Sequence, residues 1–489
     1  MARTSAEPDV QVSRHTRAGW ILTLLFVGNL LNFYDRQLPS IVLEQIKAEY
    51  ALDDAQVGLL ASAFVVVGAI AGIPLGMLAD RYARKWVAGI GLLVWSAFTA
   101  LGGVKGLGFG AFFWTRVGVG VGEASYGPAT GSLISDLYPS DRRSRANAIF
   151  NMGFPVGLLL SFLTVGGIAE AFDSWRAPFL VAAVPGLVVA ILILLIKEPA
   201  RGQADRDEAA RAEAERLAAP GAGASLPIGS AAATVGPDLT GDADAVGPAP
   251  IPPSPAAHRR ALATVLRIKS MYGLIIGFAG YNFAAYAVGT FLTPVLQRYY
   301  GLDLVPAALT SGVVIGVTGL IGLLLGGRVL DRAARRSASR RVLTAAVFLV
   351  AAAVFSVIGL AAGQDSLWQL VLFLGLGYLF GIIYLAAYVP AVTDVVAPRS
   401  RSTAIGVVYA IALLLGGAGG PLVTGAVSDS INASRATDLA SDVAAAQGLQ
   451  AAMMIVVPIG FAVAALGTFL VARFADADRA RMLAEEVSA

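Results

Sequence analysis

The chain contains no cysteine and only two histidines among its 489 residues. Disulfide bonds, thiolate metal sites and cysteine nucleophiles are therefore excluded. Both histidines, His15 and His258, lie outside the apolar segments, so no histidine-based metal centre or catalytic triad is predicted. No G-x-x-x-x-G-K-[ST] phosphate loop is present either. We expect no metal, no cofactor and no enzyme activity.

Charged residues are also scarce, at 14% of the chain, whereas hydrophobic residues make up 56%. This balance does not fit a surface exposed to water. The apolar residues fall in runs of roughly 20, the length that a helix needs to cross a bilayer. The net charge is +3, but the basic residues form short clusters between these runs, so nucleic-acid binding is not predicted. The composition indicates an all-α integral membrane protein.

Twelve apolar runs divide the chain into two sets of six, which we expect to form two bundles of transmembrane helices. The segment between the sets is rich in Ala, Pro and Gly, which is typical of a flexible linker, although residues 205–217 have the charge pattern of a short surface helix. The predicted regions are an N-terminal tail (1–17), a first bundle (18–197), a linker (198–269), a second bundle (270–474) and a C-terminal tail (475–489).

Lysine and arginine residues are concentrated in alternate loops, after the second, fourth, eighth and tenth runs. Cations beside transmembrane helices are retained on the cytoplasmic side. We therefore expect a multi-pass protein of the cell (inner) membrane whose two termini and linker are cytoplasmic. The cations that carry this signal in the first half are Arg81, Arg84, Lys85, Arg142, Arg143 and Arg145.

A ten-residue segment occurs twice, each time after the second run of its set. Residues 76–85 read GMLADRYARK, and residues 327–336 read GRVLDRAARR. A repeat at corresponding places indicates two homologous halves, which is how many secondary transporters are built. The shared positions are Gly76, Asp80, Arg81, Arg84 and Lys85 in the first copy and Gly327, Asp331, Arg332 and Arg335 in the second.

This repeated segment resembles the G-x-x-x-D-R-x-x-R-[KR] motif of the major facilitator superfamily. The resemblance implies twelve transmembrane helices in two pseudo-symmetric six-helix bundles, working by alternating access as a monomer. It also implies that the motif closes the cytoplasmic side when the cavity faces out, with Asp136 as the partner of Arg81 or Arg84. The alternative is that these charges only fix the topology.

Four stretches of the first half are further similar to the spinster branch, whose members export lipids, sphingosine phosphate and lysophospholipids. They are NFYDR at 32–36, GLL at 58–60, RVGVGVGEA at 116–124 and EPARG at 198–202. The similarity implies a small amphipathic substrate and contact with membrane lipids. The long Ala/Pro-rich linker departs from that branch, so a transporter of sugars, drugs or small metabolites stays an alternative.

Ionisable residues inside the apolar runs are costly in a membrane and mark candidate functional sites. Arg116 and Glu123 are seven residues apart, so they lie on nearly the same helix face. We predict that Asp35 or Glu123 binds a proton and releases it when Arg116 approaches, and that Arg116 also holds an anionic head group. The neighbouring Arg36 is expected to be solvated. A static network of ion pairs, or a solvated Asp35, is the alternative.

The second half lacks these charges, because its fourth run reads FLGLGYLFG at 373–381. We expect it to supply an apolar, aromatic wall opposite the charges, which would suit an amphiphile. Helix packing explains each tyrosine of this wall equally well. The predicted substrate-binding residues are Arg116, Asn32, Tyr34, Asn151, Tyr281, Asn282, Tyr286, Tyr378 and Tyr384.

Overall fold

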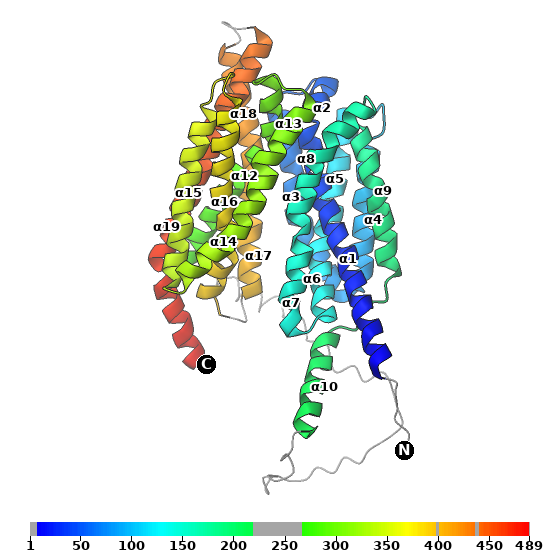
Figure 1. Ribbon diagram of the computed structural model, residues 1–489. Coiled ribbons are helices and arrows are strands. Elements are labelled where there is room, and N and C mark those ends of the chain that lie inside the picture. The colour runs from blue at the N-terminus through cyan, green and yellow to red at the C-terminus, as the bar shows by residue number, and fades with distance from the viewer. Residues whose placement is uncertain (1–6, 219–266, 398–400, 436–439, 489) are drawn as a thin grey trace.

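The computed structural model describes residues 7–218, 267–397, 401–435 and 440–488, which form two helical bundles side by side (Figure 1). Helix α10 (Gln203–Ala218) projects from the first bundle, at the end of the molecule where both chain termini lie. The first bundle contains α1 (Glu7–Ile41), α2 (Leu43–Tyr50), α3 (Asp54–Arg81), α4 (Arg84–Gly102), α5 (Phe109–Ala124), α6 (Tyr126–Leu137), α7 (Ser140–Asn151), α8 (Gly153–Ala171) and α9 (Ala177–Leu195).

The second bundle repeats this order with longer continuous helices. It contains α12 (Lys269–Arg298), α13 (Leu304–Ser311), the π-helix η1 (Gly312–Val317), α14 (Thr318–Ala334), α15 (Ala338–Leu360), α16 (Leu367–Val395), α17 (Arg401–Ala412), the π-helix η3 (Leu413–Gly417), α18 (Gly419–Arg435) and α19 (Ser441–Ser488).

Ten helices or helix pairs among the described residues are long and apolar enough to cross a membrane. Helix α1 and the pair α5–α6 complete the twelve crossings that the sequence predicts. Helix α1 carries Asp35 and Arg36, whereas α5 and α6 are each short and α5 carries Arg116 and Glu123. The crossings that are least apolar are therefore the ones that bear charge.

Several crossings expected as single helices are broken. The fourth is divided at Ser125 and the fifth at Met152. A proline follows each break by three residues, Pro128 after Ser125 and Pro155 after Met152. Because proline has no N–H group, it leaves the carbonyl four residues earlier without its helical partner. The two breaks are therefore explained by Pro128 and Pro155.

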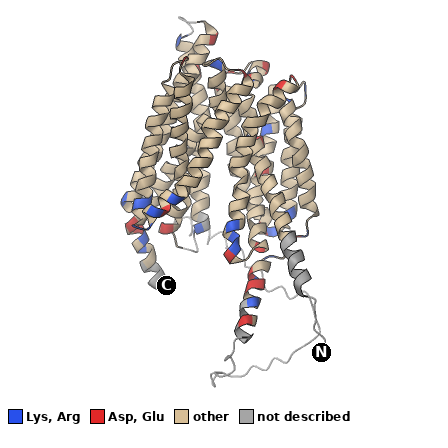
Figure 2. Ribbon diagram, viewed as in Figure 1, with Lys and Arg blue, Asp and Glu red and all other residues tan. Residues whose placement is uncertain are grey.

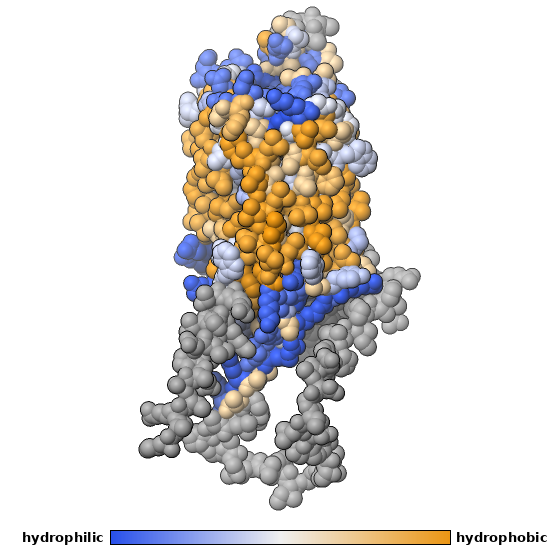
Figure 3. Space-filling view, turned by 90° about the vertical axis from the view of Figure 1, so that its right-hand side faces the viewer, coloured by the Kyte–Doolittle hydropathy of each residue, from blue (hydrophilic) through white to orange (hydrophobic). Residues whose placement is uncertain are grey.

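The side of the molecule is an apolar belt between two polar rims (Figure 3). Lysine and arginine gather at the end that carries both termini and α10 (Figure 2). We call this end the linker face and the opposite end, where α2 lies, the far face. The belt and the charge asymmetry are those of a protein that crosses a bilayer.

The two bundles contact each other mainly toward the far face. Helix α3 packs against α18, and α8 packs against α13 and η1. Between α1 and α12, the side-chain amide of Gln37 donates to the carbonyl of Gly289 at 2.8 Å. These contacts close the far face and leave a cavity between the bundles.

Candidate functional site

A cavity of about 300 Å³ lies between the bundles. Its first-bundle wall comes from α1, α3, α5 and α8, with Leu43 from α2. Its second-bundle wall comes mainly from α12, with single contributions from η1 and α17 and two from α16. The lining includes Phe33, Asp35, Arg36, Gln37, Phe64, Arg116, Phe154, Phe278, Tyr281, Asn282, Tyr286, Tyr378 and Tyr409.

One ion pair, between Arg36 and Glu123, lies at the first-bundle wall of the cavity. The Nη2 of Arg36 lies 2.9 Å from Oε2 of Glu123, and its Nε donates to the same oxygen at 3.3 Å. The Arg36 guanidinium lies over the ring of Phe33 at 5.0 Å and that of Phe64 at 5.3 Å. Glu123 is buried behind it, with 2% of its side chain exposed. Arg36 is therefore the cation that covers Glu123 from the cavity.

Asp35 also borders the cavity, but it is only 2% exposed and reaches Thr99 on α4. The Thr99 hydroxyl donates to its Oδ2 at 3.3 Å, whereas its Oδ1 has no partner among the described residues. A buried carboxylate oxygen without a partner is costly. Asp35 is thus a buried acid that no cation covers directly.

Arg116, on α5, is 4% exposed and forms no ion pair with a described carboxylate. It donates to the carbonyl of Phe98 at 3.3 Å, and its guanidinium lies 5.0 Å from the centre of the Phe179 ring. Asp35 and Glu123 both act on it electrostatically. The structure therefore brings the three predicted charges into one neighbourhood, but the direct ion pair joins Glu123 to Arg36.

The opposite wall is aromatic. The rings of Phe278 and Tyr281 lie parallel, with centroids 6.3 Å apart, and Phe278 stacks on Tyr388 at 4.0 Å. Tyr286 on α12 and Tyr409 on α17 also line the cavity. The second bundle thus presents a largely aromatic wall to the cavity.

The structure corrects part of the predicted site. Arg36, expected to be solvated, faces the cavity and forms the ion pair with Glu123, and the alternative of a solvated Asp35 is wrong because Asp35 is buried. Three predicted substrate-binding residues do not line the cavity. The Tyr34 hydroxyl bonds Thr164, Asn151 is exposed and bonds the Asn147 carbonyl, and Tyr384 is buried within the second bundle.

Six predicted residues do line or adjoin the cavity. Arg116, Tyr281, Asn282, Tyr286 and Tyr378 are in its wall. Asn32 lies one helical turn before Arg36 and accepts a hydrogen bond from it at 3.4 Å. Sequence reasoning missed the aromatic members Phe278 and Tyr409. Phe278 and Tyr281 are three residues apart and so share a helix face, which is a signal that the sequence does contain.

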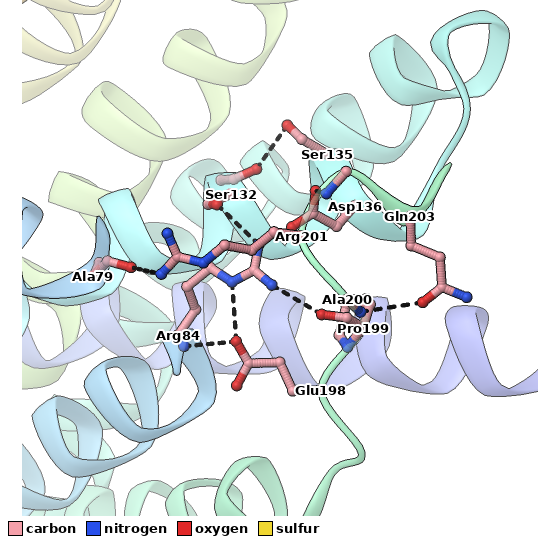
Figure 4. A network of polar contacts seen from close by, with 12 residues as sticks. Ala79, Arg84, Ser132, Ser135, Asp136, Glu198, Pro199, Ala200, Arg201 and Gln203 are labelled. Atoms are coloured by element: carbon pink, nitrogen blue, oxygen red, sulfur yellow. Dashed lines mark hydrogen bonds and ion pairs between the residues drawn. The ribbon is translucent and has the colours of Figure 1, made fainter. Parts of the chain in front are cut away.

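The first copy of the repeated motif forms a polar cluster at the linker face (Figure 4). Arg84, only 2% exposed, forms ion pairs with Asp136 and with Glu198, the latter at 3.0 Å. Its Nη2 also donates to the carbonyl of Pro199 at 2.9 Å. Of the two partners predicted for Asp136, the structure selects Arg84.

The segment EPARG at 198–202 completes this cluster. The Arg201 guanidinium donates to the carbonyls of Ala79, Asp80 and Tyr82, at and just beyond the end of α3. The Gly202 N–H donates to Asp136 at 2.7 Å. All these contacts stay within the first bundle and its own C-terminal extension, so the motif does not hold the two bundles together in this structure.

The second copy of the motif does not reproduce the pair. Its Arg335 is exposed, and the partly buried pair at the corresponding place joins Arg341 to Asp394. Helix α4 begins at Arg84 itself, whereas α15 begins at Ala338, three residues after Arg335, and the pairing arginine lies six positions beyond the one that the motif indicates. The second bundle therefore also forms an Arg–Asp pair at this place, but its arginine is not the one that the repeated motif contains.

Comparison with known proteins agrees with this architecture. A model of the Major Facilitator Superfamily matches residues 25–421. An MFS-type efflux pump of Mycolicibacterium smegmatis is 30% identical over 421 residues, 85% of this chain and 86% of that protein. Protein spinster homolog 1 of Homo sapiens is 29% identical over 484 residues, 95% of this chain and 82% of that protein.

Solved structures show the same likeness. A bacterial homolog of the human lysosomal transporter spinster, in an inward-facing and unoccupied conformation, superposes with a TM-score of 0.77 at 25% sequence identity. The alignment covers 94% of this chain and 98% of that chain, so both bundles take part in it.

Proposed function

The chain belongs to the Major Facilitator Superfamily, whose members are transporters rather than enzymes, and we propose that it moves a lipid-like organic anion by proton-coupled alternating access. The predicted fold and the resemblance to spinster proteins are confirmed. The proposed substrate has one apolar tail and an anionic head, as in a lysophospholipid or a sphingosine phosphate.

The observation that carries the proposal is the Arg36–Glu123 ion pair on the wall of a cavity whose opposite wall is aromatic. A guanidinium suits a phosphate or carboxylate because it can donate two parallel hydrogen bonds. The rings of Phe278 and Tyr281 offer the apolar area that a hydrocarbon tail requires. Such a divided cavity complements an amphiphile at both ends.

The same ion pair supports a coupling scheme. A head group that binds Arg36 competes with Glu123 for one cation. Once Arg36 turns to the substrate, Glu123 is a buried carboxylate without its partner, and protonation removes that cost. Substrate binding and proton uptake are then linked through Arg36.

Asp35 supports a second proton site. It is buried, has one unpartnered oxygen and lies in the field of Arg116. A shift of α5 relative to α1 that brings Arg116 within ion-pair distance would favour the carboxylate, and the reverse shift would favour the neutral acid. We assign Asp35, Glu123 and Arg116 to proton coupling on this basis.

We also propose that the linker face is cytoplasmic and that the protein lies in the inner membrane. The cations at that face support this orientation by the positive-inside rule (Figure 2). The cavity would then open to the cytoplasm in the described conformation, since the bundles meet at the far face.

The proposal is tested by uptake into proteoliposomes. A fluorescent lysophospholipid is offered with and without an imposed pH gradient, to the unchanged protein and to Asp35→Asn, Arg36→Ala and Arg116→Ala. We expect the gradient to accelerate wild-type transport about tenfold, Asp35→Asn to lose that response, and Arg36→Ala to bind the probe at least tenfold more weakly. Tyr34→Phe, outside the cavity, is the matched control and keeps wild-type transport.

Transport that ignores the pH gradient would remove proton coupling. Equal binding of the probe by wild type and Arg36→Ala would remove the assigned head-group site.

A second candidate is efflux of drug-like molecules, which the name of the M. smegmatis relative favours. A lipophilic cation and a sugar are therefore included in the same assay. Transport of either one without competition by lysolipid would replace the lipid proposal.

A further inference from the structure

Two helices that begin at the far face receive a carboxylate from the opposite bundle. At the start of α3, the N–H groups of Asp54 and Ala55 donate to Oδ1 and Oδ2 of Asp429, at 3.1 Å and 2.7 Å. Asp429 lies on α18, in the second bundle. The N–H of Gln56 donates to Oδ1 of Asp53, in the first bundle, at 2.7 Å. The first N–H groups of α3 are therefore capped by Asp53 of its own bundle and by Asp429 of the other bundle.

The reverse arrangement occurs at α13. The N–H of Val305, in the first turn of α13, donates to Oε1 of Glu170 at 3.4 Å. Glu170 lies at the end of α8, in the first bundle. A helix start leaves its first four N–H groups without intrahelical acceptors and attracts anions, so both carboxylates are placed where they stabilise a helix of their partner.

The two caps correspond under the internal repeat. Asp429 follows Gly425 by four residues in the fifth crossing of the second bundle, and Glu170 follows Gly166 by four residues in the fifth crossing of the first. Each helix that they cap is the second crossing of the other bundle. A Cβ on Gly425 would lie 2.0 Å from the carbonyl oxygen of Asp54, so glycine is what lets α18 approach α3.

We propose that Asp429 and Glu170 are helix caps donated in trans that hold the far face shut, and that opening of this face requires both to be released. When the bundles separate, α3 and α13 each lose the carboxylate acceptor that the other bundle supplies. Alternating access then exchanges these interbundle hydrogen bonds for bonds to water.

The two caps are unequal. Around Asp429, the guanidinium of Arg298 bridges Glu44 and Asp54, Lys47 pairs with Asp54 at 2.6 Å, and the Ser428 hydroxyl donates to Asp54 at 2.7 Å. Arg298 and Ser428 belong to the second bundle, so they add to the interbundle contact. Glu170 makes one longer bond, and a Cβ on Gly166 would lie 3.3 Å from its nearest neighbour on α13. Asp429 is the main latch.

The absence of cysteine from the chain permits a direct test. Spin labels are attached at Lys105→Cys and Asp365→Cys, two exposed loop positions at the far face of the two bundles, and distances are measured by pulsed electron paramagnetic resonance in nanodiscs. We expect Asp429→Ala to raise the long-distance population at least threefold. Asp429→Asn, which keeps one acceptor oxygen, has an intermediate effect, Glu170→Ala has a smaller one, and the double alanine variant exceeds either single change.

Asp53→Ala is the matched control, because Asp53 caps α3 within its own bundle. We expect it to lower the Tm and leave the distances unchanged. A second label pair, Arg142→Cys with Arg332→Cys at the linker face, should shorten in the variants in which the far-face pair lengthens, which distinguishes conformational exchange from unfolding.

The proposal is overturned if the double alanine variant, folded by its Tm, keeps the wild-type distances, or if Asp53→Ala moves them as much as Asp429→Ala. No substrate or pH gradient is used, so this outcome is independent of the lipid and proton proposals.

Discussion

At the scale of single residues, the neighbours Asp35 and Arg36 take opposite roles although they are adjacent in sequence. Successive residues on a helix point about 100° apart. Asp35 therefore reaches Thr99 on α4, whereas Arg36 reaches Glu123 and the cavity. The sequence located the charged position but could not say which of the two pairs with Glu123, because that depends on how α1 is rotated against α4 and α5.

A second residue-scale feature lies outside the membrane-spanning helices. Glu49, on α2, accepts hydrogen bonds from Arg176 and from the indole N–H of Trp175, the latter at 2.7 Å. The hydrogen bond from Arg176 lowers the pKa of Glu49 from its ordinary value, and partial burial opposes this shift. A carboxylate whose pKa is lower in the folded state stabilises the protein above its unfolded-state pKa, and this contribution is lost as the pH falls through its folded-state pKa.

We expect Glu49→Gln to lower the Tm by only about 1–2 °C at pH 7, because 39% of the Glu49 side chain is exposed and water screens the ion pair. The difference in Tm between wild type and variant should be constant above about pH 5 and shrink as the pH falls below about 4. Thermal unfolding across this pH range measures it. A difference that grows on acidification would contradict the assignment.

At the scale of elements, residues 198–202 fasten three helix ends of the first bundle. Glu198 accepts hydrogen bonds from the backbone N–H of Arg84 and of Lys85, at the start of α4, at 2.8 Å and 3.4 Å. The Arg201 guanidinium binds the last carbonyls of α3, and the Gly202 N–H binds Asp136 on α6. Helix ends carry unpaired backbone groups, so a short polar segment is an efficient way to satisfy several of them. This explains why EPARG follows the sixth crossing.

We predict that Glu198→Ala lowers stability by about 2 kcal/mol, since it removes a charged acceptor from two N–H groups and from buried Arg84. Thermal unfolding in detergent should show a lower Tm for this variant than for wild type. Glu215→Ala, on the exposed part of α10, is the control and should stay within about 0.5 kcal/mol. Equal Tm values for the two variants would show that Glu198 does not fasten the helix ends.

At the scale of the whole molecule, the twelve crossings and their division into two bundles arise from apolar length and from the internal repeat. The orientation in the membrane is a further proposal that the chain is well suited to test, because every introduced cysteine is the only one present. Lys105→Cys and Asp365→Cys lie at the far face, and Arg142→Cys lies at the linker face.

In intact cells, we expect a membrane-impermeant maleimide to label Lys105→Cys and Asp365→Cys. Arg142→Cys should be labelled only after the membrane is permeabilised, because the linker face is proposed to be cytoplasmic. The opposite pattern would reverse the orientation.

The membrane class, the twelve crossings, the repeat and the neighbourhood of Asp35, Arg116 and Glu123 could be predicted from the sequence, because apolar length, repetition and a charge inside an apolar run are local features. Three pairings required the folded structure: Arg36 covers Glu123, Arg341 replaces Arg335 as the partner of Asp394, and Asp429 caps α3. Each of these pairs joins different helices, and their partners depend on helix rotation and on the approach of the two bundles. No spacing along one helix encodes that geometry.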